Sequence, residues 1–239
     1  MKSVASTFKC RGRPRDIRTH MERLRWVVPT LIMSAAIGGI LFVSAGQWQI
    51  PAFWMYLLVW TAAGLVAVVV LDPSLYRERM SPGGKTIGFG YWLLTVPLIA
   101  HWVLAGLDVG REHWSDTVPR WLQGIGLIGF AFGFGLIVWA MAVNRFFSSV
   151  VRIQSDRGHR LVTGGPYGWI RHPGYLAALL QTIFSGMALG SWVSMIPVML
   201  MLPLLFARTI REDRFLRGNL PGYPEYAQRV RYRLVPRVW

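Results

Sequence analysis

Four long apolar stretches constrain this chain more than any other feature of its sequence. They cover residues 26–46, 51–71, 87–107 and 121–143, and each has the roughly 20 residues that a helix needs to cross a bilayer. Of the 239 residues, 53% are hydrophobic and 15% are charged, whereas a soluble domain carries about 25% charged residues. The sequence therefore predicts an all-α, polytopic membrane protein with four long transmembrane spans over residues 26–143.

Two shorter apolar stretches, residues 175–189 and 192–207, follow the long ones. They are separated by Gly190 and Ser191 alone, so we predict a tight C-terminal helical hairpin whose two ends face the same side of the membrane. Such a hairpin either spans a thinned bilayer or turns back before the far side. The predicted architecture is a helix bundle of four spans plus this hairpin.

The lysines and arginines are distributed unevenly between the loops. If the N-terminus is cytoplasmic, 24 of the 26 lie on the cytoplasmic side, and the other two, Arg111 and Arg120, lie between the third and fourth spans. By the positive-inside rule both termini are then cytoplasmic. The same rule accounts for the net charge of +15, so we predict no nucleic-acid partner. We expect the basic leader, residues 1–25, to be disordered and to contact anionic lipid headgroups or only fix the topology.

Several kinds of chemistry are excluded by the cysteines and histidines. The single cysteine, Cys10, cannot form an intramolecular disulfide or a cysteine-based metal site. The five histidines lack the spacing that places two metal ligands on one helical face, so no metal is predicted. Residues 124–129 match the dinucleotide fingerprint G-x-G-x-x-G, but they lie inside a span. Gly129 and Gly133 better suit close helix packing.

Polar groups gather in the loop before the hairpin, residues 144–173, and directly after it, residues 208–213. Glycines and Pro166 break any helix in the loop. Arg208 and Glu212 are four residues apart and share one helical face, which alone suggests a simple ion pair. An ionisable cluster at a membrane surface is a functional hypothesis by default, although a positive loop that only sets the topology is the alternative.

Four motifs follow one another in residues 144–239. They are His159-x-Leu161-Val162-Thr163-x-Gly165-x-Tyr167, Arg171-His172-Pro173-x-Tyr175, Glu212-Asp213, and Gly222-Tyr223-Pro224-Glu225-Tyr226. Together they resemble the isoprenylcysteine carboxyl methyltransferase family and the neighbouring phospholipid methyltransferases. A segment after the second span, Asp72-Pro73-x-Leu75 with Arg77 and Arg79, also looks like a loop of bacterial relatives.

The resemblance implies that S-adenosyl-L-methionine binds at the cytoplasmic face, within a methyltransferase core formed by residues 144–239. Glu212 would hold the polar end of the cofactor, and we prefer it to the shorter Asp213. Arg208 would lie near the substrate carboxylate, with Arg171 as a second cationic candidate. The remaining cofactor-lining candidates are Gln154, His159, Leu161, Val162, Tyr167, His172, Pro173, Gly174 and Tyr175.

The implied function is carboxyl O-methylation of a lipophilic or lipidated acceptor that arrives from the bilayer. A carboxylate nucleophile has no proton to lose, so aligning donor and acceptor and excluding water suffice. A thiol or a lipid amine as acceptor would instead need a base. An NADPH-dependent reductase of the sterol-reductase type and a membrane scaffold are the rival classes. The short loops and the basic leader suggest a bacterial inner membrane.

Overall fold

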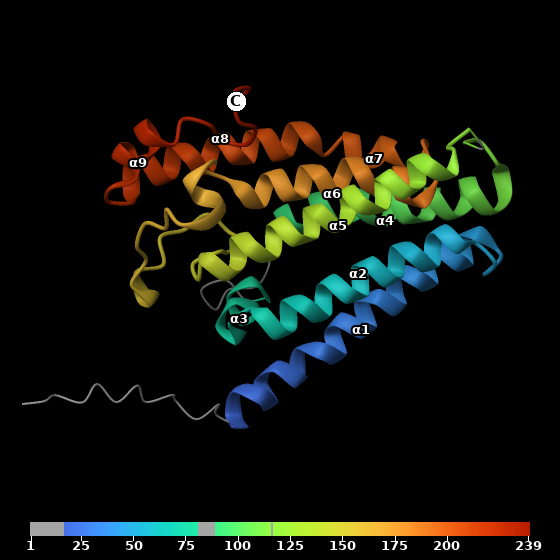
Figure 1. Cartoon of the computed structure of the whole chain (residues 1–239), viewed down its shortest axis with the longest axis horizontal. Coiled ribbons are helices and arrows are strands. Elements are labelled where there is room, and N and C mark those ends of the chain that lie inside the picture. Colours follow the sequence, from blue (N-terminus) through green and yellow to red (C-terminus); the bar gives the residue numbers. More distant parts are fainter. Residues whose placement is uncertain (1–16, 81–88, 116) are drawn as a thin grey trace, which may run out of the picture.

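The computed structural model describes residues 17–80, 89–115 and 117–239, and the regular structure in these ranges is helical. The long helices run roughly parallel to one another along the longest axis (Figure 1). In chain order the elements are α1 (Ile17–Ala45), α2 (Pro51–Val70), α3 (Pro73–Met80), α4 (Phe89–Leu107), the π-helical turn η2 (Asp108–Glu112), α5 (Arg120–Val143), the 3-10 turns η3 (Ser155–Arg157) and η4 (Gly165–Gly168), α6 (Pro173–Leu189), α7 (Met195–Met199), α8 (Leu202–Asn219) and α9 (Tyr223–Arg229).

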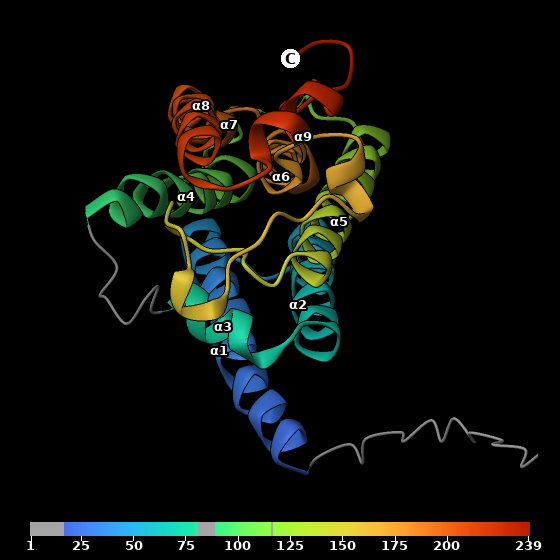
Figure 2. The same ribbon diagram turned by 90° about the vertical axis from the view of Figure 1, so that its left-hand side faces the viewer.

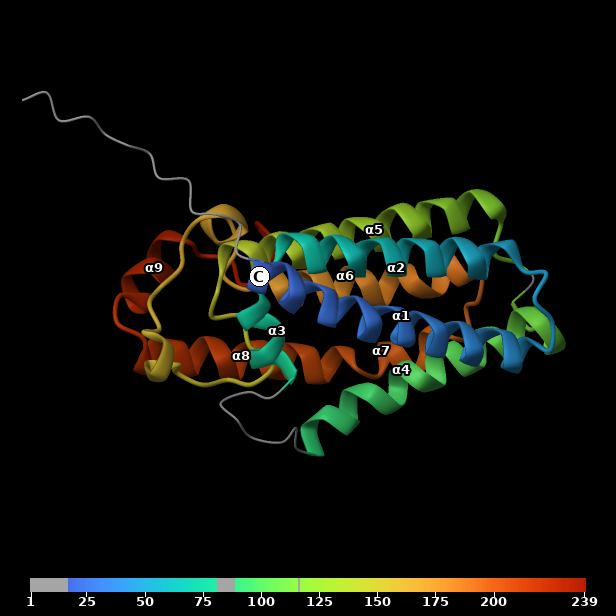
Figure 3. The ribbon, with the colours of Figure 1, turned by 90° about the horizontal axis from the view of Figure 1, so that it is seen from below.

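Among the described residues, three helices are long and apolar enough to cross a membrane: Arg23–Ala45 within α1, Pro51–Val70 and Arg120–Val143. They expose large apolar side chains, such as Ile32, Leu58 and Ile128, which suits contact with lipid. The predicted third span corresponds to α4, whose described residues begin at Phe89. Seen from below, α1 and α2 lie side by side (Figure 3).

The first helix begins earlier than the sequence suggested. It starts at Ile17, so the expectation of a disordered leader is wrong for residues 17–25, while residues 1–16 lie outside the described ranges. The sequence from Ile17 to Arg25 contains no glycine or proline, so its backbone can continue the helix out of the apolar segment.

Glycines on α5 allow it to pack closely against α6. A Cβ atom on Gly126 would collide with the backbone of Ala188, and one on Gly129 would collide with the ring of Phe184. A Cβ on Gly133 would lie 2.9 Å from the side chain of Gln181. The expectation that these glycines serve helix packing is therefore confirmed, and α5 holds α6 over its whole length.

The prediction of one continuous second helix in the hairpin, over residues 192–207, is wrong in both continuity and length. Gly190, with φ of +80°, ends α6 in the left-handed conformation that glycine tolerates best. The chain then forms the short α7, breaks, and restarts as α8 at Leu202, with Pro203 in its first turn. Since proline cannot donate the backbone hydrogen bond of a helix interior, the restart falls there. The helix then continues past residue 207 to Asn219 and makes the charged segment helical.

Most of the non-helical chain lies at one end of the helix bundle. Viewed from this end, residues 144–172 cross from α5 towards α3 and return to α6, while α8, α9 and the C-terminal tail lie above them (Figure 2). The hydrophobic core lies among α1, α2, α4, α5 and α6 and includes Leu41, Phe53, Trp102 and Phe130. Because the core is built from the helices, the loop end is free to carry polar groups.

Candidate active site

Tyr175 links the two charged residues that the sequence placed on one face of α8. Its hydroxyl donates to Oε2 of Glu212 at 2.6 Å and accepts from Nε of Arg208 at 2.8 Å. Nη2 of Arg208 also donates to the backbone carbonyl of Ser149. Tyr175 therefore joins α6 to α8, and its hydroxyl links Arg208 to Glu212. Arg208 in turn joins α8 to the loop after α5.

Glu212 and Asp213 have different environments although they are adjacent. Glu212 is half-buried, and among the described residues its Oε1 has no hydrogen-bond partner. Asp213 is 1% exposed and accepts from Arg171 Nε at 2.7 Å, from Tyr223 at 3.0 Å and from Arg217 and Arg233. Glu212 as the acid that binds the cofactor stays a prediction; of the two acids, it is the one with an oxygen that has no partner among the described residues.

Asp213 is held in its ionised form. Burial alone would raise the pKa of its carboxyl, but hydrogen bonds from His172 and Arg171, and the charge of Arg171, hold that pKa well below its usual range. Nε2 of His172 lies 3.3 Å from Oδ1 of Asp213. This carboxylate is thus the centre of a buried ionic cluster and not a free ligand group.

Arg171 connects this cluster to the C-terminal tail. Its guanidinium donates to the carbonyl oxygens of Val230 and Arg231 at 2.7 and 2.8 Å, besides its bonds to Asp213. Its backbone nitrogen donates to the carbonyl of Tyr232 at 3.0 Å. Arg171, the predicted second cationic candidate, is therefore buried, and its guanidinium is hydrogen-bonded to other groups of the protein.

Gln154 and His159 lie together in the loop after α5, and both are bound to that loop. The amide nitrogen of the Gln154 side chain donates to the carbonyl of Phe146 at 2.6 Å, and its oxygen accepts from Arg157 at 2.7 Å. Nδ1 of His159 accepts from the backbone of Gln154 at 3.2 Å. Burial and the charges of Arg152 and Arg157 lower the pKa of His159, so its ring is neutral at pH 7.

The other predicted cofactor residues lie along the same loop and at the start of α6. Tyr167 is buried, and its hydroxyl accepts from Asn144 at 3.2 Å. Leu161 packs against the cluster of Leu220, Tyr223, Tyr226 and Ala227, and Val162 is half-buried beside it in the chain. His172 precedes α6, Pro173 lies in its first turn, and Gly174 and Tyr175 follow.

Gly174 is where a ring approaches the backbone of α6. A Cβ atom at this position would lie 2.5 Å from Cζ of Phe147. A side chain here would force the ring or the loop to move, so the sequence needs glycine at this contact. Across the whole site, the predicted residues lie near the start of α6 and beside Arg208 and Glu212 of α8. Gln154 and His159 lie in a neighbouring part of the loop.

The sequence missed an ionic contact between α3 and the loop after α5. Glu78, 7% exposed, accepts from Nε of Arg152 at 3.1 Å and from its Nη2 at 2.9 Å. Ser148 donates to the same carboxylate at 2.9 Å, and Asp156 accepts from Arg152 at 2.8 Å. The two partners are 74 residues apart, so no local spacing signals this contact.

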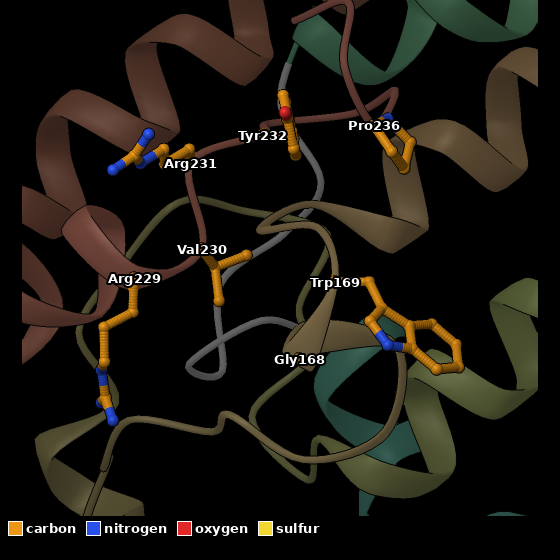
Figure 4. Close-up of a pocket in the computed structure, with 7 residues that line it drawn as sticks. All are labelled: Gly168, Trp169, Arg229, Val230, Arg231, Tyr232 and Pro236. Carbon is orange, nitrogen blue, oxygen red and sulfur yellow. The ribbon is translucent and has the colours of Figure 1, made fainter.

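A separate hollow lies beside the C-terminal tail (Figure 4). It has a volume of about 360 Å³ and is lined by Gly168, Trp169, Arg229, Val230, Arg231, Tyr232 and Pro236. None of the predicted cofactor residues is among these seven. Among the residues that the structure describes, no group of three or more His, Cys, Asp or Glu side chains could hold a metal ion.

Comparison with known proteins shows which family part of the chain resembles. Residues 125–218, from α5 to the end of α8, match the isoprenylcysteine carboxyl methyltransferase (ICMT) family. This part of the chain is therefore similar to the ICMT family. The match includes the start of α6 and the turn of α8 that bears Arg208 and Glu212, so the candidate site lies within the ICMT region.

Curated relatives and one solved ICMT structure resemble larger parts of the chain. The cobalt-zinc-cadmium resistance protein CzcN of Cupriavidus metallidurans is 32% identical over 67% of this chain and 65% of its own length. A probable protein-S-isoprenylcysteine O-methyltransferase of Oryza sativa is 30% identical over 50% of this chain and 61% of its own length. The aligned part of this chain thus spans less than two thirds of either relative.

The solved structure of the eukaryotic intramembrane Ras methyltransferase ICMT shares the fold. It aligns with a TM-score of 0.58 over 89% of this chain and 82% of that chain, at 18% sequence identity. At this identity the likeness concerns the helical architecture and says nothing about substrate.

Proposed function

We propose that this protein is an integral-membrane S-adenosyl-L-methionine-dependent methyltransferase that esterifies the carboxylate of a lipophilic acceptor of the isoprenylcysteine type. The ICMT match over residues 125–218 carries the proposal. The contacts of Tyr175 with Arg208 and Glu212 support it, because they place a cation and an accessible carboxylate at the start of α6. The family match favours methyl transfer over NADPH-dependent reduction.

The described residues suit the proposed cofactor. Oε1 of Glu212 can accept a charge-assisted hydrogen bond from a cationic amino group, and the ring of Phe147 lies against Gly174 at the start of α6. The buried Tyr167 and the half-buried Leu161 and Val162 offer apolar surface along the same loop. When bound, S-adenosyl-L-methionine would supply a methyl group that its sulfonium already activates.

Arg208 is the group that we assign to the acceptor. Its guanidinium can hold a carboxylate by two parallel hydrogen bonds, and its stem can lie along hydrocarbon at the end of the apolar part of α8. The side chains then orient the acceptor and exclude water, and no base is needed. We assign Arg171 a positioning role instead, because its guanidinium is buried and is already paired with the carboxylate of Asp213, whereas Arg208 has no carboxylate partner among the described residues.

We further propose that the site faces the cytoplasm of a bacterial inner membrane, with both termini on that side. The predicted distribution of 24 of the 26 Lys and Arg residues supports this orientation. A substrate with a lipid tail would then reach the site from the surrounding membrane lipids.

The proposal is tested with the purified full chain in lipid nanodiscs. We expect calorimetric binding of S-adenosylhomocysteine, no competition by NADPH, and transfer of labelled methyl from S-adenosyl-L-methionine to N-acetyl-S-farnesylcysteine. The methyl ester of that acceptor is the control, since it has no free carboxylate. The labelled product should release methanol in alkali, whereas a methylated thiol or amine would not.

Arg208→Lys should lower turnover steeply while the affinity for S-adenosylhomocysteine stays near the wild-type value, because lysine keeps the charge but loses the planar two-point contact. Absence of S-adenosylhomocysteine binding would contradict the methyltransferase proposal. An alkali-stable product would contradict the carboxylate acceptor and favour a thiol or an amine.

A further inference from the structure

A third arginine, Arg79, reaches the candidate site from α3. Its guanidinium carbon lies 5.3 Å from the ring centroid of Phe147, within the range of a cation–π contact. The same ring lies against Gly174, at the start of α6, and packs beside Leu71, Leu75 and Met141. Arg79, Phe147 and Gly174 therefore form a continuous stack that joins α3 to the residue before Tyr175.

Ser149 connects Arg79 with Arg208. The Ser149 hydroxyl donates to the backbone carbonyl of Arg79 at 3.2 Å, and the Ser149 carbonyl accepts from the guanidinium of Arg208. Burial, and then the positive charge of Arg208, lower the pKa of Arg79. Ser149 thus contacts both arginine residues, at the backbone of Arg79 and at the guanidinium of Arg208, and the two half-buried side chains carry like charges on either side of it.

The nearby acids form contacts with groups other than Arg79 and Arg208. Glu78 binds Arg152 and Ser148, and Glu212 accepts from Tyr175. Among the residues that the structure describes, neither Arg79 nor Arg208 has a carboxylate oxygen within 4.0 Å of its nitrogens. Two neighbouring cations of this kind are stabilised when an anion binds between them, and planar guanidinium groups match the geometry of a carboxylate.

We propose that Arg79 and Arg208 together bind the carboxylate of the methyl acceptor, with one arginine from α3 and the other from α8. This inference rests on the proposed function, because that function supplies the carboxylate. It adds a substrate-binding residue outside the region that matches the ICMT family, residues 125–218. It also gives α3 a role, since the Glu78–Arg152 ion pair fixes this helix against the loop that bears Phe147 and Ser149.

The test compares binding of an acid and of its uncharged amide. The full chain in nanodiscs is titrated with N-acetyl-S-farnesylcysteine and with its carboxamide, and the ratio of the two dissociation constants is measured for each variant. We expect the wild type to prefer the acid, and Arg79→Gln to lose roughly tenfold to a hundredfold of this preference, the effect of one charge-assisted contact. Arg79→Lys should lie between the two.

The matched control is Arg77→Gln, which removes an equal charge from the same helix at an exposed position and should keep the wild-type preference. Binding of S-adenosylhomocysteine shows that each variant is folded, and it should stay unchanged in Arg79→Gln. The inference is overturned if the wild type does not prefer the acid, if Arg77→Gln and Arg79→Gln lose equal preference, or if Arg79→Gln changes affinity for both ligands alike.

Failure of the inference and failure of the proposed function are distinguishable. A wild type that methylates the acid while Arg79→Gln keeps the full acid preference would overturn the inference and leave the methyltransferase proposal intact. A wild type that prefers the acid through Arg79 but transfers no methyl group would support the carboxylate site and contradict the proposed reaction.

Discussion

Replacing Asp213 with asparagine should destabilise the protein far more than the same carboxylate-to-amide change at Glu212. The side chains of Arg171 and Asp213 are each 2% exposed, so loss of the negative charge leaves a buried guanidinium supported by the carbonyls of Val230 and Arg231 alone. Removing one partner of a buried ion pair costs about 3–5 kcal/mol. Asparagine can still accept one hydrogen bond, so we expect a loss of about 3 kcal/mol in the free energy of unfolding.

Glu212→Gln provides the matched comparison. Glu212 is half-buried, and among the described residues its hydrogen-bond partner is the hydroxyl of Tyr175, so no buried cation loses its counter-charge. We expect its unfolding free energy to stay within about 1 kcal/mol of the wild-type value, and its affinity for S-adenosylhomocysteine to fall roughly tenfold to a hundredfold. Thermal unfolding followed by tryptophan fluorescence and calorimetric binding measure the two effects.

The reasoning is refuted if Asp213→Asn unfolds at the wild-type temperature, or if Glu212→Gln is the less stable of the two. A double variant tests the cause. Arg171→Met with Asp213→Leu removes both charges and replaces them with apolar groups, an exchange that is often neutral or stabilising. It should recover much of the stability that Asp213→Asn loses. A double variant no more stable than Asp213→Asn would show that the unpaired arginine is not the reason.

Three further predictions concern the loop contact, the pH and the topology. Gly174→Ala should weaken binding of S-adenosylhomocysteine by displacing Phe147, whereas Gly218→Ala, with nothing within 4 Å of the added atom, should not; calorimetry compares them, and equal effects would contradict the contact. The lowered pKa of Asp213 means that its stabilisation is complete well above the unfolded value of about 4 and is lost progressively as the pH falls below it. The melting temperature of the wild type should therefore fall as the pH is lowered below about 4, and it should fall less in Asp213→Asn. A cysteine at Thr117, introduced after the native cysteine is replaced, should react with an impermeant reagent from outside the cell, and reaction from the cytoplasm alone would overturn the predicted topology.

The apolar pattern predicted the helices well because a bilayer imposes both length and composition on a span. The positions of α2 and α5 agree with the stretches read from the sequence to within one residue, and the glycines of α5 do pack against α6. Helix ends outside the apolar region were predicted poorly. Hydropathy does not indicate that the charged residues from Arg208 to Asn219 continue α8, since their helix depends on local propensity and on the tail that packs against it.

The roles of individual charged residues could be predicted only in part. The spacing of Arg208 and Glu212 correctly placed both on one helix, but it suggested a direct ion pair, whereas the hydroxyl of Tyr175 links them. The partners of Arg171 come from residues 213 and 230–231. The sequence alone cannot show that the Arg171 guanidinium is already hydrogen-bonded within the protein, because its partners lie 42 to 60 residues away along the chain.

Glu212 and Asp213 are adjacent on α8, but they face different parts of the protein. Consecutive residues on an α-helix point about 100° apart, so when Asp213 faces Arg171, Tyr223 and the tail, Glu212 faces Tyr175. The ionic cluster around Asp213 therefore fixes the rotation of α8 about its axis, and this rotation decides where Glu212 and Arg208 point. Weakening the attachment of the tail should then alter the geometry of the candidate site, even though no residue of the tail is assigned to cofactor or acceptor.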